Sequence, residues 1–218
     1  MSDVGFFAAY ALWRDPMIVA LLGAALCSFV GVYIVLKRVV FVSAALSQLS
    51  GVGVALFFWL AATFGLDPHH PPIWADPLWF ALTFAVLGSA LFSLNLGHRR
   101  LSSESVVGLG YLVASSLVLV VLNSPRIAQE AHEVNDLLYG NAVAVAPEQI
   151  PIMAGVGAAV FVTHALFAKE FVLVSFDAEM ARTLGYRARR WNLLLFITIG
   201  VAISVATRAT GALPVFGF

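Results

Sequence analysis

The chain has 218 residues, of which 61% are hydrophobic and only 11% are charged, and its formal net charge is zero. Its mean hydropathy is +0.94. A soluble domain of this length needs more charge than this to stay dispersed in water, so the composition excludes that class and indicates a membrane protein.

Six stretches without a charged side chain follow one another along the chain. They cover residues 16–36, 39–66, 77–97, 105–125, 149–168 and 191–207. Most of them reach the roughly 20 residues that cross a hydrocarbon core of about 30 Å. The sequence therefore predicts an all-α, polytopic membrane helix bundle with about six transmembrane helices in a single domain over residues 1–218. The last helix is expected to be the shortest.

The second stretch carries a polar seam in its first turns, which consists of Ser43, Ser47, Gln48 and Ser50. Polar side chains inside a membrane helix are costly in hydrocarbon, and they usually face a bundle interior or a transport pathway. These four residues are therefore the candidates for a translocation pathway. Hydrogen bonding between helices is the alternative interpretation.

Two connecting loops contain side chains that can bind a borderline metal ion. Asp67, His69 and His70 lie in the loop after the second stretch, and His132 lies in an acidic loop after the fourth. Carboxylates and imidazoles are ligands for such ions. The simpler interpretation is that both loops are solvated polar connections, so a metal site in them remains a hypothesis.

The connection at residues 175–190 has the signature of a short helix. Ser175 or Asp177 can cap its start, Glu179 places an acid in its first turn, and Gly185 can end it in the left-handed conformation.

One face of this short helix is apolar, because Phe176, Met180 and Leu184 follow one another at intervals of four residues. Such a helix can lie on the membrane surface, or it can insert into a groove of a cytoplasmic protein.

Basic residues are distributed unevenly between the two sides of the predicted bundle. With the N-terminus outside, Arg14, Arg126 and Arg208 fall on the outer side. The other nine of the twelve fall on the inner side: Lys37, Arg38, Arg99, Arg100, Lys169, Arg182, Arg187, Arg189 and Arg190. The positive-inside rule assigns the inner side to the cytoplasm.

Taken together, these motifs resemble the membrane permease subunit of the zinc/manganese class of ATP-binding-cassette importers, over nearly the whole chain. The matching residues are 31–38, Leu46, Ser47 and 51–56; Ser103, Glu104 and Gly108; 136–141 and 146–148; and 175–179, Ala181, Leu184 and Gly185. Each piece alone is weak, whereas their order and spacing together are fairly specific.

The resemblance implies a homodimer in a bacterial inner membrane, a separate cytoplasmic ATPase subunit and an extracytoplasmic metal-binding protein that delivers the cargo. It also implies that the segment from Phe176 to Arg190 contains the coupling helix that sits in a cleft of the ATPase. The contact residues would be Phe176, Asp177, Glu179, Met180, Leu184 and Gly185.

No enzymatic activity and no bound cofactor are expected of the chain itself. Neither Lys37 nor Lys169 belongs to a Gly-x-x-x-x-Gly-Lys-Ser/Thr loop, so the chain has no P-loop for ATP. The nucleotide would be bound by the partner subunit, and the transported species would be a metal ion or a metal complex.

Two features depart from the family pattern. Members that carry transition metals have Asp and, four residues later, His early in the second helix, whereas this chain has Ala44 and Gln48. Neither provides a carboxylate or an imidazole, so zinc cannot be assigned from the resemblance alone. In addition, residues 211–218 stop in apolar sequence where the family continues, so we expect one or two C-terminal helices to be missing.

Three alternatives from other classes remain open. A gradient-driven transporter or channel would need acids within the membrane, and the predicted helices contain almost none. A membrane enzyme would need a cluster of catalytic side chains, and no such motif is found. The polar seam is equally compatible with a permease that has diverged to a substrate other than a metal.

Overall fold

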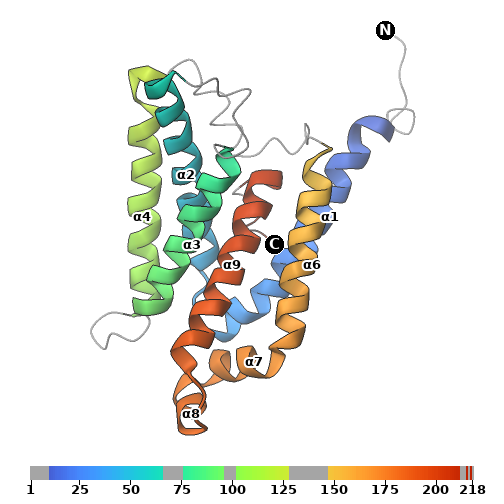
Figure 1. Cartoon of the computed structure of the whole chain (residues 1–218), viewed down its shortest axis with the longest axis vertical. Helices are drawn as coiled ribbons and strands as arrows, with labels where there is room; N and C mark the ends of the chain where they lie inside the picture. Colours follow the sequence, from blue (N-terminus) through green and yellow to red (C-terminus); the bar gives the residue numbers. More distant parts are fainter. Residues whose placement is uncertain are drawn as a thin grey trace.

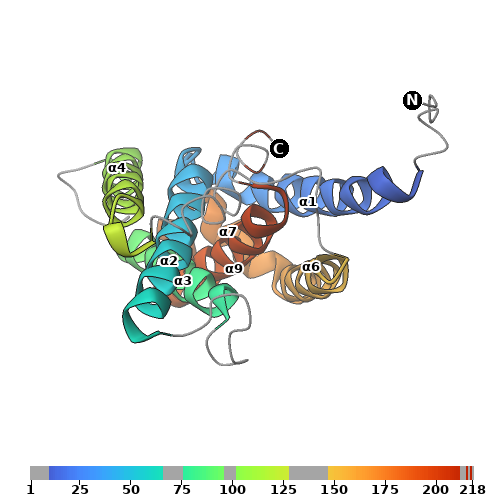
Figure 2. The same ribbon diagram turned by 90° about the horizontal axis from the view of Figure 1, so that it is seen from above.

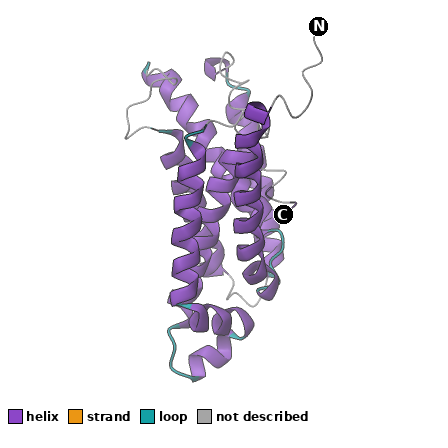
Figure 3. Ribbon diagram, turned by 90° about the vertical axis from the view of Figure 1, so that its right-hand side faces the viewer, coloured by secondary structure: helices purple, strands orange, loops and turns teal. Residues whose placement is uncertain are grey.

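The computed structural model describes residues 10–65, 76–95, 102–127, 147–211, 215 and 217. Figures 1 and 3 show that these ranges form helices, and no strand occurs in them. The elements are α1 (Tyr10–Leu36), α2 (Val42–Phe64), α3 (Pro77–Asn95), α4 (Ser103–Leu122), the short 3-10 helix η2 (Pro125–Ile127), α6 (Gln149–Leu166), α7 (Ala168–Phe176), α8 (Ala178–Thr183) and α9 (Ala188–Thr210).

Six helices of the described part, α1, α2, α3, α4, α6 and α9, are long and apolar enough to cross a membrane. This confirms the predicted all-α bundle of six spans. The expected length of the last span was wrong, because α9 has 23 residues and α6 only 18. The charge-free stretch was shorter than the helix because α9 has Arg189 and Arg190 in its first turn and Arg208 in its last turn.

Viewed from above, the bundle has α4 at one edge and α1 and α6 at the other (Figure 2). Helix α2 packs against α3 and α4, α3 also packs along α9, and α9 in turn contacts α1 and α6. Leu46, Phe196 and Ile199 belong to a core that joins α1, α2 and α9. A second core joins α2 to α3, α4 and η2 around Phe57 and Ile127. Helices α2 and α9 are therefore the central elements.

The backbones of α2 and α3 come into direct contact at Gly53. A Cβ atom at this position would lie 2.7 Å from the carbonyl carbon of Phe80 and 2.9 Å from the backbone nitrogen of Ala81. Real Cβ atoms do not approach backbone atoms so closely. The hydrogen side chain of glycine is thus what allows these two helices to pack at this distance.

One end of the bundle is closed by α7 and α8, and we call it the α8 end. The helix is interrupted after α6 at Phe167, whose φ is −113° and ψ is 28°. Helix α7 then runs across the bundle, and α8 projects beyond it (Figures 1 and 3). The sequence predicted one short helix in this connection, and α7 is an additional one.

Candidate functional site

Helix α8 is held in place by both of the residues that the sequence predicted to limit it. The Asp177 side chain caps its start, because Oδ1 accepts hydrogen bonds of 2.9 Å from the backbone N–H groups of Glu179 and Met180. Gly185, with φ of 83°, lets the chain turn back towards α9. The predicted cap and the predicted left-handed glycine are both confirmed.

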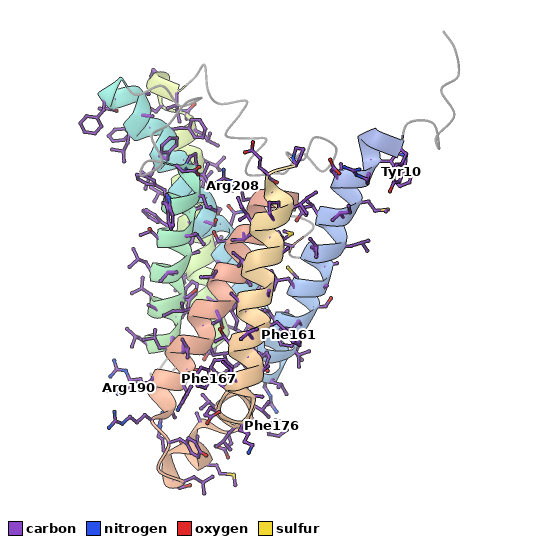
Figure 4. The ribbon with its side chains drawn as sticks, turned by 45° about the vertical axis from the view of Figure 1, so that its right-hand side comes forward. Tyr10, Phe161, Phe167, Phe176, Arg190 and Arg208 are labelled. Carbon is purple, nitrogen blue, oxygen red and sulfur yellow. The ribbon has the colours of Figure 1, made fainter. Side chains whose placement is uncertain are left out.

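The predicted apolar stripe lies exposed at the tip of this structure. The exposed fractions are 78% for Phe176, 53% for Met180 and 57% for Leu184. Figure 4 shows the side chain of Phe176 at the α8 end, pointing away from the bundle. Water is a poor solvent for such a stripe, so the geometry favours a surface that another molecule covers.

The opposite face of α8 is anchored to the bundle. Ala181 is fully buried, and it packs with Val174 of α7 and Ala188 of α9 in a small separate core. Met180 is therefore presented on a supported helix, with Phe176 at the end of α7 and Leu184 just after α8. The prediction of one continuous helical stripe was wrong, because the extended backbone of Asp177 separates Phe176 from α8. A displacement of α8 would therefore be transmitted to α7 and α9 through these contacts.

The polar seam of α2 divides into two parts in the structure. Ser47 and Ser50 are buried, with exposed fractions of 3% and 2%. The Ser47 hydroxyl donates to the Ala44 carbonyl of its own helix at 2.8 Å. The Ser50 hydroxyl forms a buried hydrogen bond of 2.9 Å with the hydroxyl of Ser204 in α9. The contact of Ser50 supports the interhelical interpretation for that residue.

Ser43 and Gln48 are only half-buried, as is Ala44. The Ser43 hydroxyl makes a long contact of 3.4 Å to the carbonyl of Val40. The structure thus does not bring the four seam residues together on one inward face, and their role in a pathway stays a prediction. Ser204 was missed at the sequence level, although a serine within an apolar span was a usable signal.

A buried polar network lies where α1 ends. Nζ of Lys37 donates to the carbonyl of Val174 at 2.8 Å and to Oδ1 of Asn192 at 2.5 Å. Nδ2 of Asn192 in turn donates to the hydroxyl of Ser93 at 3.0 Å. Burial lowers the pKa of Lys37 from its ordinary 10.5 to about 8. The network joins the end of α1 to α3, α7 and α9.

At the opposite end, Arg208 of α9 pairs with Asp76 at the start of α3. Nη1 of Arg208 lies 2.9 Å from Oδ1 of Asp76, and the same oxygen accepts from the backbone N–H of Leu78 at 2.7 Å. Burial alone would raise the pKa of Asp76, but these two hydrogen bonds and the nearby positive charge hold it below its ordinary value. The pair joins the start of α3 to the end of α9, at the end of the bundle opposite α8.

The loop residues that could bind a metal, Asp67, His69, His70 and His132, lie outside the described residues. Among the residues that the structure describes, no three His, Cys, Asp or Glu side chains gather closely enough to hold a metal ion.

Several known permeases are similar to the chain. Over 200 residues it is 24% identical to the manganese import system permease protein ScaB of Streptococcus gordonii, an alignment that covers 92% of this chain. The chain spans about two thirds of that relative, because the same alignment covers 66% of ScaB.

Two solved structures share the fold. PsaBC from Streptococcus pneumoniae, solved in complex with Fab, aligns over 93% of this chain and 68% of its own with a TM-score of 0.70 and 22% identity. An inward-facing structure described as a metal-chelate type ABC transporter aligns over 96% of this chain and 67% of its own, with a TM-score of 0.71 and 15% identity. The model of the ABC 3 transport family matches residues 9–218, so the chain is an integral membrane protein that belongs to this family.

Proposed function

We propose that the chain is the permease subunit of an ATP-binding-cassette importer that moves a metal ion or a metal complex across a bacterial inner membrane. A separate ATPase subunit would supply the energy. The observation that carries the proposal is the exposed apolar stripe of Phe176, Met180 and Leu184, which lies on and beside α8, a helix anchored to α7 and α9. Membership of the ABC 3 transport family supports it.

The α8 end is proposed to face the cytoplasm. Lys37, Lys169 and Arg182 lie in or beside the connections at this end, and Arg190 begins α9 there. Arg208 lies at the opposite end (Figure 4). Under the positive-inside rule, this distribution supports a cytoplasmic α8 end and an N-terminus outside.

Helix α8 and its flanking residues are proposed to be the coupling element, with Phe176, Met180 and Leu184 seated in an apolar groove of the ATPase. Asp177 and Gly185 would act by shaping the helix, since one caps it and the other turns the chain. Glu179 is exposed beside the stripe, where it can bind a polar rim of the groove. The element suits the recognition of an amphipathic helix in a groove.

Introduction of a positive charge into the stripe tests this coupling role. We expect Met180→Arg or Leu184→Arg to abolish co-purification of the full chain with its ATPase subunit, because a buried unpaired cation costs several kcal/mol at an apolar interface. Met180→Leu is the matched control, and it should retain the complex because it keeps an apolar side chain of similar volume. Retention of the ATPase by both arginine variants would refute the assignment.

The cargo is proposed to be a divalent transition metal or its complex, and the name of ScaB supports manganese as one member of the class. Ala44 and Gln48 stand where the family pattern has metal ligands, and both are half-buried on α2. A metal ion that passes these two residues would then stay hydrated or chelated. In the alternative, the polar residues of α2 only form hydrogen bonds between helices. A homodimer and an extracytoplasmic metal-binding protein complete the proposed assembly.

Metal accumulation tests the cargo. Cells that express the complete importer should accumulate at least one of manganese, zinc, iron and cobalt above the level of cells without it, as measured by mass spectrometry of washed cells. The amide oxygen of Gln48 is a harder ligand than an imidazole, so it predicts a weaker preference for zinc. Unchanged cellular contents of all four metals would refute the proposal that the cargo is a metal. The proposal that the chain is a permease subunit would then still be tested by the co-purification experiment.

The gradient-driven alternative receives no support from the described spans. Their only acids are Asp15 and Glu104, both close to a span end. Asp15 pairs with Arg14 at 2.8 Å, and Oε1 of Glu104 accepts from the backbone N–H of Val40 at 2.6 Å. Neither lies in the middle of the membrane, where proton or sodium coupling would need it.

A further inference from the structure

A polar cavity of about 510 Å³ opens at the α8 end, between the end of α1 and the starts of α4 and α9. Three cations line it: Lys37, Arg182 and Arg189. Three serine hydroxyls and Asn192 add to its polar lining, and no acid is among the described residues that line it. We propose that this cavity binds a phosphate group.

The position of the cavity corresponds to the level of lipid headgroups. Four of the six spans end or begin at its wall, since Lys37 follows α1, Leu94 lies near the end of α3, Ser103 begins α4 and Ala188 begins α9. Span ends mark the boundary of the hydrocarbon layer. A basic pocket between spans at this depth can reach the phosphate of an anionic lipid as well as a free phosphate from water.

Ser175 is a side chain without a partner that lines this cavity. It is only 5% exposed, and its hydroxyl oxygen is buried without a hydrogen-bond partner. The buried serines of α2 do have partners, since Ser47 donates to its own backbone at 2.8 Å and Ser50 bonds to Ser204 at 2.9 Å. A buried hydroxyl that does not pair loses free energy, so an acceptor bound beside this wall would stabilise it.

Lys37 has capacity left to bind an acceptor. Its ammonium group carries three protons, and two of them are donated to Val174 and Asn192. The third can be donated to an oxygen in the cavity. A phosphate offers several strong acceptor oxygens to such a donor and to the guanidinium groups of Arg182 and Arg189.

The start of α9 is unfavourable without an anion. Arg187, Arg189 and Arg190 gather there, although the helix dipole places its positive end at an N-terminus and disfavours cations. Helix α4 also directs its N-terminus to the cavity wall at Ser103. An anion in the cavity would offset the repulsion at the start of α9, and it would also lie beside the start of α4.

The test measures ligand-dependent thermal unfolding of the purified full chain. The probes are inorganic phosphate, with chloride at equal ionic strength as its control, and dihexanoyl phosphatidic acid, with dihexanoylglycerol, which lacks the phosphate, as its control. We expect the unfolding midpoint to rise with at least one phosphate probe and with neither control, as binding to the native state requires. Stabilisation only by the lipid identifies a headgroup site, and stabilisation by inorganic phosphate identifies a small-phosphate site.

Two double variants with the same loss of charge locate the site. Arg182→Gln with Arg189→Gln removes two cavity cations, and we expect it to weaken the apparent affinity about tenfold or more. Arg187→Gln with Arg190→Gln is the matched control, since both side chains are exposed at the same helix start but do not line the cavity. Ser175→Ala should weaken binding severalfold without changing the charge.

Two results would overturn the site. The first is that neither phosphate probe raises the midpoint above its control. The second is an equal loss of affinity in the two double variants, which would show attraction by surface charge in general. All substituted arginines are exposed, so the variants should fold, and their unfolding midpoints without ligand provide the check.

Discussion

Replacement of Gly53 by alanine is expected to separate α2 from α3 and to lower the free energy of unfolding by about 1–3 kcal/mol, as overpacking of a dense core does. The added methyl group would meet the backbone of Phe80 and Ala81 at less than 3 Å. Backbone in the middle of a helix cannot rotate away as a side chain can. The clash should therefore outweigh the gain of about 1 kcal/mol that alanine brings to a helix.

Thermal unfolding of the purified protein, followed by tryptophan fluorescence, measures this effect. A change of 1 kcal/mol corresponds to roughly 2–4 °C for a chain of this size, so the midpoint should fall by several degrees. Gly108→Ala in α4 is the matched control, because a Cβ there meets nothing within 4 Å. Equal midpoints for the two variants would show that α2 and α3 do not pack as closely as described.

The second large effect is expected from Asn192→Leu, which removes one acceptor from the partly buried ammonium of Lys37 and the donor to Ser93. Leaving such groups without partners costs about 2–3 kcal/mol. Asn192→Asp keeps an acceptor for Lys37, and Ser93→Ala isolates the weaker branch of the network. We expect the leucine variant to unfold at the lowest temperature of the three.

The pH dependence of the free energy of unfolding distinguishes the contribution of the Lys37 charge from that of side-chain packing. Burial lowers the pKa of Lys37 to about 8, so the unfolded chain binds the proton more tightly than the native protein between about pH 8 and 10.5. The free energy of unfolding of the native sequence should therefore rise through this window. In Asn192→Asp the new carboxylate raises the pKa of Lys37, and the rise should become smaller. An unchanged rise in that variant would contradict the contact.

Much of the α8 region was predictable because its signals are local. A cap at Asp177, a turn at Gly185 and an apolar stripe at intervals of four residues depend on neighbours within one or two turns of helix. The charge-free stretch ends at residue 168, close to the break at Phe167, but no Gly or Pro marks a change of direction there, and only the backbone angles show where α6 ends. The absence of such a signal also concealed α7, which begins two residues after α6 ends.

The seam of α2 shows the opposite case. Its residues are identifiable as polar side chains in an apolar span, but the partner of Ser50 lies at residue 204, on a helix far away in the sequence. A single pattern of polar residues cannot distinguish a face that lines a pathway from one that binds a neighbouring helix. Only the packing of α2 against α9 showed that Ser50 is turned inward.

By itself the sequence determined that this protein is a bundle of six membrane spans with a capped helix carrying an apolar stripe, since hydropathy and short-range capping follow from residue order alone. Only the tertiary structure decided that Lys37, Ser175 and Arg189 line one cavity. These residues belong to three different elements, and nothing in their spacing along the chain brings them together. Their proximity results from how the helices pack, which is set by close contacts such as that of Gly53 with the backbone of α3.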